Sequence, residues 1–335
     1  MSLQDVIPAG TKMITGLGSA LVDILIHESD SFLETTGAAK GGMELVAEEA
    51  IQAILDRSQA EKQVVPGGSA CNTIIGVGSL GGQGRFVGKC GQDEFGSLFA
   101  NDLEKNQVDP ILFPSASPTG RVLSIITPDA QRTMLTCLGA SAETSPQEIT
   151  DDCFIHSAIV HLEGYLLFNQ ELMTAALQVA KKTGAAVSLD LASFTVVEQS
   201  MGFLEQIVHD YVDILIANED EARAFTGFSD EQKAIAALSE KAKIAVLKVG
   251  KKGSYIADHG NIVRIQAQEG AGGVIDTTGA GDLWASGFLF GMVNGFSTET
   301  CGKLASACGF EVCQVVGASI PEEGWQRIRS LIPEA

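Results

Sequence analysis

The chain is poor in basic residues and has no long apolar run. Its 22 Lys and Arg residues are outnumbered by 42 Asp and Glu residues, which gives a net charge of −20 at pH 7. Because such a surface repels nucleic acid phosphates and anionic lipids, we expect neither a nucleic acid nor a membrane as a partner. No apolar stretch of about 18 residues is free of polar residues, so a membrane span is not expected either.

Cysteine and histidine show no pattern of metal ligands or disulfides. The 7 cysteines are odd in number, and neither they nor the 5 histidines follow a ligand spacing such as Cys-x-x-Cys. The cysteines are interpreted as small core residues in a reducing compartment, not as a zinc site or a disulfide scaffold. Residues 1–12 lack a charged region followed by an apolar stretch, so no secretory signal is expected. Together these features predict a cytoplasmic protein.

With 335 residues, of which 45% are hydrophobic, the chain can form a large domain with a small appendage. From residue 159 onwards, apolar runs typical of strands alternate with helical patterns, which predicts an α/β fold with a mostly parallel sheet covered on both faces. The earlier part is less regular. Residues 12–26 predict one strand, residues 64–72 a turn that runs into a helix, and residues 121–127 and 132–137 a β-hairpin.

The most informative segment is Asp276–Asp282, which reads Asp-Thr-Thr-Gly-Ala-Gly-Asp and precedes an apolar run long enough for a helix. Side chains this small leave the N–H groups of Gly279, Ala280 and Gly281 open to an anion, and a helix N-terminus favours negative charge. Asp282 lies where that anion would bind, so it could take the proton of an acceptor in phosphoryl transfer. As bare spacing, the segment fits a glycine-rich turn that caps a helix equally well.

This segment resembles, at every defined position, the signature Asp-Thr-x-Gly-Ala-Gly-Asp of the PfkB or ribokinase-like family of carbohydrate and nucleoside kinases. The resemblance runs from about residue 16 to residue 321 and is nearest in pattern to the adenosine kinase branch. It implies a three-layer αβα fold in a single domain, residues 1–335, with a small β lid formed by about residues 19–46 and 118–139. It also implies ATP-dependent transfer of the γ-phosphoryl group to a hydroxyl of an adenosine-like, ribose-like or fructose-like acceptor, with Asp282 as the general base.

On the acceptor side, the resemblance rests on the sequence Gly-Gly-Ser-Ala-Cys-Asn at residues 67–72. It implies that Asp23, Gly67, Gly68 and Asn72 bind the acceptor. This fits their chemistry, since glycine admits a substrate against the backbone and an amide can both donate to and accept from hydroxyls. The resemblance further implies that Arg132, in the hairpin, reaches the transferring phosphate and offsets its charge. Taken singly, these residues are also typical of turns, helix caps and strand edges.

On the nucleotide side, Asn-Glu-Asp-Glu at residues 218–221 matches the family's Asn-x-x-Glu element. The resemblance implies that Glu221 holds Mg²⁺ through water, whereas spacing alone favours an acid that stabilises a helix start. It implies ATP contacts at Asn218, Lys248, Gly250, Gly253 and Thr277. Residues 317–319 with Asp276 resemble the loop pair that binds a monovalent cation in relatives, which leaves activation by K⁺ open.

Several alternatives stay open at this point. The chain could be a non-catalytic sensor of the same fold that binds a nucleotide or a sugar, although the intact signature at residues 276–282 argues against it. It could be a pyrimidine or pyridoxal-type vitamin kinase, although the hairpin at residues 118–139 argues against that. The resemblance decides neither the acceptor nor whether the lid pairs two subunits in a homodimer.

Overall fold

A sheet of nine strands forms the middle layer of the larger part of the molecule. The computed structural model describes residues 6–129, 131–270 and 273–333. Within them the strand order is β14 (Asn261–Ile265), β13 (Ser254–Asp258), β12 (Ile244–Lys248), β11 (Ile214–Asn218), β10 (Ala186–Asp190), β9 (Ser157–Glu163), β1 (Met13–Leu17), β5 (Gly84–Gly91) and β6 (Val108–Ser115). The β12–β13 and β13–β14 pairs are antiparallel and the other neighbouring pairs are parallel. The predicted, mostly parallel sheet is confirmed.

Helices cover both faces of this sheet. One face carries α3 (Ser69–Ser79), α4 (Glu94–Lys105), α10 (Ala280–Val293) and α11 (Thr298–Val312), with α12 (Glu322–Arg329) packed outside them. The other face carries α5 (Asp151–Phe154), α6 (Gln170–Thr183), α7 (Phe194–Tyr211), α8 (Glu219–Thr226) and α9 (Glu231–Ser239). Successive strand residues point to opposite faces, so Ile214 and Ile216 join the first core and Leu215 joins the second. The expected three-layer αβα arrangement is confirmed.

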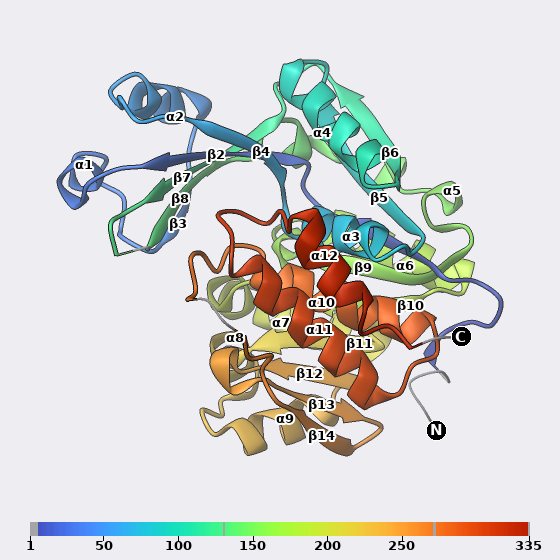
Figure 1. Cartoon of the computed structure of the whole chain (residues 1–335). Helices are drawn as coiled ribbons and strands as arrows, with labels where there is room; N and C mark the ends of the chain where they lie inside the picture. The colour runs from blue at the N-terminus through green and yellow to red at the C-terminus, as the bar shows by residue number, and fades with distance from the viewer. Residues whose placement is uncertain (1–5, 130, 271–272, 334–335) are drawn as a thin grey trace.

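A second, smaller sheet projects from one end of the larger part (Figure 1). Its strand order within the described residues is β3 (Met43–Leu45), β8 (Arg132–Cys137), β7 (Gly120–Ile126), β2 (Leu21–His27) and β4 (Gln63–Gly67). Helices α1 (Asp30–Glu34) and α2 (Glu48–Leu55) pack on it and close a separate small core. The antiparallel β7–β8 pair confirms the predicted hairpin. The sheet draws on both segments assigned to the lid and also includes β4.

Two local predictions are wrong. Residues 12–26 form two strands instead of one, because the chain leaves the large sheet after Leu17 and enters the small sheet at Leu21. Residues 64–67 belong to β4 instead of a turn. Pro66 is tolerated there because β4 is an edge strand, bonded in the described sheet only to β2. None of the helices in the described residues is both long and apolar enough to cross a membrane.

Candidate active site

A cleft of about 1450 Å³ lies between the small sheet and the carboxyl ends of the large sheet's strands. In an open α/β sheet this edge is the usual place for a ligand. Four neighbouring parallel strands, β9 to β12, each contribute their last residue to its wall: Glu163, Asp190, Asn218 and Lys248. The small sheet contributes Asp23 and Arg132, and residues 276–282, which lead into the first turn of α10, also line the cleft. The topology therefore gathers groups that are far apart in the sequence.

The glycine-rich segment forms the start of α10. Gly279 is the N-cap residue and has a φ of 71°, a left-handed conformation that favours glycine. The Ala280 N–H donates to the Thr277 carbonyl at 3.1 Å, so one of the three amides expected to meet an anion is engaged in the turn. The amides of Gly279 and Gly281 find no acceptor in the part of the chain that the structure describes. They are available to a bound anion at the positive end of the helix.

Asp282 lies in the first turn of α10 and is held by two residues of α3. Ser69 Oγ donates to its Oδ1 at 2.7 Å, and Asn72 Nδ2 donates to its Oδ2 at 2.9 Å. Ser69 and Asn72 are three residues apart, so both project from one face of the helix. Burial raises the pKa of Asp282, and these two hydrogen bonds oppose that rise. Ser69 was not among the predicted site residues, and Asn72 contacts the predicted base as well as lining the cleft.

Asp23, on β2, is buried beside the cleft. Its Oδ1 lies 3.5 Å from Arg132 Nη2. Burial raises the pKa of Asp23, Arg132 lowers it, and Asp282 raises it further. A Cβ at Gly67 would collide with the Asp23 carboxylate, so a side chain there would displace this carboxylate. Gly68, at the start of α3, lines the cleft directly.

Arg132 joins the small sheet to the glycine-rich segment. Its Nε donates to Ser124 Oγ on β7 at 3.0 Å, and its Nη1 donates to Thr278 Oγ1. Thr278 is in turn bonded to the Asp276 carboxylate through its N–H and its hydroxyl, at 3.0 and 2.8 Å. The structure therefore places the guanidinium of Arg132 against the segment that precedes Gly279.

At the nucleotide end, Asn218 and Glu221 cap α8 reciprocally. The Asn218 N–H and Nδ2 donate to the two Glu221 oxygens at 2.8 and 2.6 Å, and the Glu221 N–H donates back to Asn218 Oδ1 at 2.9 Å. Burial, reinforced by Asp190, raises the pKa of Glu221 to about 7. Lys248 Nζ lies 2.8 Å from Asp190 Oδ2. The side chain at 221 thus has a structural role in addition to any role toward a metal.

Two predicted nucleotide contacts lie outside the cleft wall. Gly250 and Gly253 belong to the turn between β12 and β13, and a Cβ at Gly253 would collide with the Ile265 carbonyl of β14. Thr277 lines the cleft as expected. The Asp276–Gly317 loop pair is also brought together, since the Gly317 N–H donates to Asp276 Oδ2 at 2.8 Å.

Sequence reasoning did not assign Glu163 to the site. Its carboxylate accepts hydrogen bonds from the Ser19 N–H at 2.9 Å and the Ala70 N–H at 3.1 Å. Ser19 and Ala70 lie next to the two points at which the chain passes from one sheet to the other. The hydrogen bonds to Glu163 therefore hold these two points of the chain together. Burial raises the pKa of Glu163 to about 7 despite both hydrogen bonds. Its position at the end of a buried strand is a signal in the sequence that could have pointed to it.

A helix start with two unbonded amides and a carboxylate beside it, at the carboxyl edge of a parallel sheet, is suited to an enzyme of phosphoryl transfer. Comparisons with known proteins agree. Residues 32–324 match the family described as pfkB family carbohydrate kinase, so the chain belongs to that family. Its fold is similar to that of the adenosine kinase from Sinorhizobium meliloti, with a TM-score of 0.89 and 31% identity over 96% of this chain and 100% of that one.

A probable sugar kinase protein from Rhizobium etli CFN 42 is similar to the same degree, with a TM-score of 0.88, 30% identity and coverage of 96% and 100% of the two chains. The ribokinase of Arabidopsis thaliana is 30% identical over 276 residues, which cover 78% of this chain and 70% of that protein. The protein is therefore a phosphotransferase with an alcohol group as acceptor, a carbohydrate or nucleoside kinase, and its family implies the use of ATP.

Proposed function

We propose that the protein transfers the γ-phosphoryl group of ATP to a primary hydroxyl of a nucleoside, with Asp282 as the general base. One observation carries this proposal. The Asp282 carboxylate lies in the cleft beside the available amides of Gly279 and Gly281, held there by Ser69 and Asn72. A carboxylate with a raised pKa at a phosphate-binding helix start is suited to accept a proton as an alcohol attacks phosphorus.

The chain's own groups can be given separate roles in this reaction. Asp23 and Asn72 orient the acceptor, and Asp282 takes the proton of its hydroxyl while the hydroxyl oxygen forms a bond to the γ-phosphorus. The bond between that phosphorus and the β,γ-bridging oxygen breaks, and ADP leaves with the bond's electrons. The amides of Gly279 and Gly281 and the guanidinium of Arg132 stabilise charge on the transferred group. The small sheet covers the cleft and excludes water.

The nucleotide end offers the oxygen donors that suit Mg²⁺. Asp190, Asn218 and Glu221 all line the cleft there. Among the described residues, no cluster of three or more His, Cys, Asp and Glu side chains is arranged to hold a metal. This fits Mg²⁺, which keeps several waters and takes only one or two protein carboxylates along with substrate phosphates. Glu221 would hold it through water, with Lys248 and Thr277 near the phosphates, and when bound the ion neutralises phosphate charge.

The acceptor is proposed to be a nucleoside because the cleft has an apolar side. Leu45 on the small sheet is 56% exposed and Phe168, between β9 and α6, is 49% exposed, and both line the cleft with Met43, Met134 and Tyr165. A flat base gains from such a surface, whereas a free pentose or hexose, hydroxylated all round, gains little. The similar protein from Sinorhizobium meliloti is an adenosine kinase. A ribose-like or fructose-like acceptor is the competing candidate, supported by the Arabidopsis ribokinase.

The test is an assay of ADP release with ATP and Mg²⁺ against a panel of nucleosides, ribose and fructose. We expect turnover with a nucleoside and a loss of at least ~10²-fold in kcat for Asp282→Asn, the usual worth of a general base, with ATP binding retained. Asp109→Asn, which removes an exposed carboxylate on β6, is the matched control. Turnover with sugars but not with nucleosides would mean that the acceptor is a sugar instead of a nucleoside. Saturable binding without ADP release for any acceptor would instead support a sensor.

We further propose that the small sheet acts as a lid of a single domain, that the protein is cytoplasmic, and that two copies pair through the small sheet. Its edge strands β3 and β4 offer backbone groups for such pairing. Activation by K⁺ is proposed at the Asp276–Gly317 loop pair. Sedimentation of the full chain would test the dimer, and an assay in K⁺ against Na⁺ would test the cation.

A further inference from the structure

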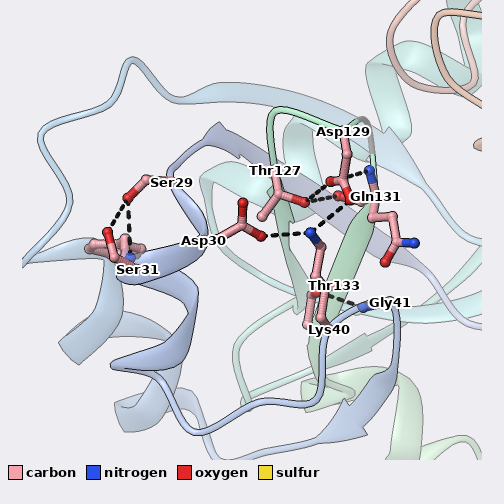
Figure 2. Close-up of polar contacts among 10 residues, drawn as sticks. Ser29, Asp30, Ser31, Lys40, Gly41, Thr127, Asp129, Gln131 and Thr133 are labelled. Carbon is pink, nitrogen blue, oxygen red and sulfur yellow. Dashed lines mark hydrogen bonds and ion pairs between the residues drawn. The ribbon is translucent and has the colours of Figure 1, made fainter.

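The ammonium group of Lys40 bridges two carboxylates at the outer end of the small sheet. Lys40, in the connection between α1 and β3, has its Nζ 2.6 Å from Asp30 Oδ1 and 2.7 Å from Asp129 Oδ2 (Figure 2). Asp30 is the first residue of α1, and Asp129 lies in the turn between β7 and β8. One ammonium group therefore joins three segments: the start of α1, the connection between α1 and β3, and the turn between β7 and β8.

The carboxylate of Asp129 also organises its own turn. Its Oδ1 accepts hydrogen bonds from Thr127 Oγ1 at 2.7 Å and from the Gln131 N–H at 3.4 Å. The Thr127 N–H in turn donates to the Gln131 carbonyl at 3.0 Å. The hydrogen bonds from Lys40 and Thr127 lower the pKa of Asp129 to about 2, so the pair with Lys40 stays ionised at any pH where a kinase works.

The residues after Lys40 are bonded to the strand that carries Arg132. The Gly41 N–H donates to Thr133 Oγ1 at 2.9 Å (Figure 2), and the Met134 N–H donates to the Gly42 carbonyl at 2.9 Å. Contacts of the Lys40 segment thus fall on both sides of Arg132: on Asp129 before it, and on Thr133 and Met134 after it.

The residue between these contacts, Arg132, reaches across the cleft. Arg132 extends from the first position of β8 to Thr278 and Asp23, and Thr278 leads into the amides at the start of α10. From this geometry we infer that Lys40 is a positioning residue: it fastens the tip of the small sheet so that Arg132 is held where the phosphoryl group is transferred. The inference rests on the proposed function, and it gives Lys40 a role that needs no contact with either substrate.

An exposed ion pair usually contributes little, because solvent screens it and two long side chains must be ordered. Here one ammonium group is shared by two carboxylates, and the backbone beside it is already fixed by the bonds of Gly41 and Met134. The entropy lost in ordering the Lys40 side chain is therefore offset by several contacts instead of one ion pair. Lys40 also borders the cleft, so a direct contact with the acceptor is the rival explanation that the experiment must separate.

The experiment compares Lys40→Met, which removes the charge at similar length, with Lys40→Arg, which keeps it. Lys182→Met is the matched control, since Lys182 pairs with Asp151 at 2.6 Å on the exposed surface of α6. We expect Lys40→Met to lower kcat about three- to tenfold, the range of one or two partly exposed ion pairs, with the KM of ATP unchanged. Lys40→Arg should recover most of kcat, and Lys182→Met should match the parent protein.

The decisive arm repeats Lys40→Met in an Arg132→Gln background. If Lys40 acts through Arg132, the second substitution adds no further loss of kcat. Losses that multiply would overturn the inference, as would a rise in the acceptor's KM alone, which is the result a direct contact predicts. So would an unchanged kcat in Lys40→Met.

Hydrogen exchange without substrates keeps this test separate from the proposed function. We expect faster exchange of the Gln131, Thr133 and Met134 amides in Lys40→Met and not in Lys182→Met. If the parent protein phosphorylates no acceptor, the proposed function fails, and the fastening role of Lys40 is judged on exchange alone. Unchanged exchange in Lys40→Met would end that role even in an active kinase.

Discussion

Removing the hydroxyl of Ser69 should shift the pH dependence of catalysis without abolishing it. Ser69 Oγ donates to Asp282 Oδ1 at 2.7 Å and so stabilises the ionised form of the proposed base. In Ser69→Ala, Asp282 keeps its bond from Asn72 at 2.9 Å but loses one of the two hydrogen bonds that, together with the charge of Lys248, oppose the effect of burial. The pKa of Asp282 must therefore rise, because only the charged form loses a donor.

The size of the shift follows from the hydrogen bond. A bond to a charged group is worth about 1.5–3 kcal/mol, and one pKa unit corresponds to about 1.4 kcal/mol, so the pKa of Asp282 should rise by about one to two units. A general base acts only when ionised, so the acidic limb of kcat/KM moves to higher pH by the same amount. On the alkaline plateau Ser69→Ala should match the parent protein, and on the acidic limb it should be at least ~10-fold slower.

The assay is a profile of kcat/KM against pH for Ser69→Ala and for Ser97→Ala, which removes an exposed serine hydroxyl on α4. We expect a displaced limb for the first variant and an unchanged profile for the second. A loss of equal size at every pH would mean that Ser69 binds substrate instead of tuning the base. An undisplaced limb would refute the assignment of Asp282 as the titrating group.

Two more predictions concern the buried acids. Burial raises the pKa of Glu163 from 4.5 to about 7 in the folded state, so the native protein binds a proton at Glu163 more tightly than the unfolded chain does. The stability that this proton gives to the folded state is complete below pH 4.5 and is lost as the pH rises through about 7. Glu163→Gln should therefore flatten the decline in the free energy of unfolding by about 1.4 kcal/mol per pH unit in that window, and equal slopes in denaturant titrations would contradict this. Glu221→Gln, which keeps one acceptor oxygen for the Asn218 N–H but removes the charge, should raise the Mg²⁺ concentration for half-maximal rate by about 10-fold or more; a metal titration that coincides with that of the parent protein would exclude Glu221 from the metal site.

The alternation of strands and helices could be predicted from the sequence. Buried parallel strands are short apolar runs, and the segments between them have apolar residues at helical spacing. The hairpin predicted at residues 121–127 and 132–137 was equally clear, and it forms β7 and β8. Helix α7 was not predicted. Its buried residues follow a helical period, but the Val196-Val197 pair is typical of a strand and Gly202 interrupts the pattern. Local propensity was therefore ambiguous there, and packing decided the structure.

The contiguous parts of the site could be predicted from the residues themselves. Asp23, Asn72 and Arg132, which depend on distant contacts, were expected only from the family resemblance, and Ser69 and Glu163 were not expected. Residues 276–282 and 218–221 each carry their own turn and helix start, so their sequence contains the information. Ser69 reaches Asp282 across 213 positions, and Glu163 reaches Ala70 across 93. The function of a serine after two glycines, or of an acid at the end of a strand, can be recognised only when the fold has brought its distant partner into contact.

The cleft presents a problem of charge, because an acidic protein lines the site of a polyanion with carboxyl groups. Two features of the structure reduce the repulsion. Lys248 pairs with Asp190 at 2.8 Å, and Arg132 stands 3.5 Å from Asp23, so two of the carboxylates face cations. Burial raises the pKa of Glu221 to about 7, which leaves this carboxyl only partly ionised near neutral pH. The charge that Glu221 retains lies where Mg²⁺ would be held, so the same carboxyl that opposes a bare nucleotide favours the metal-bound one.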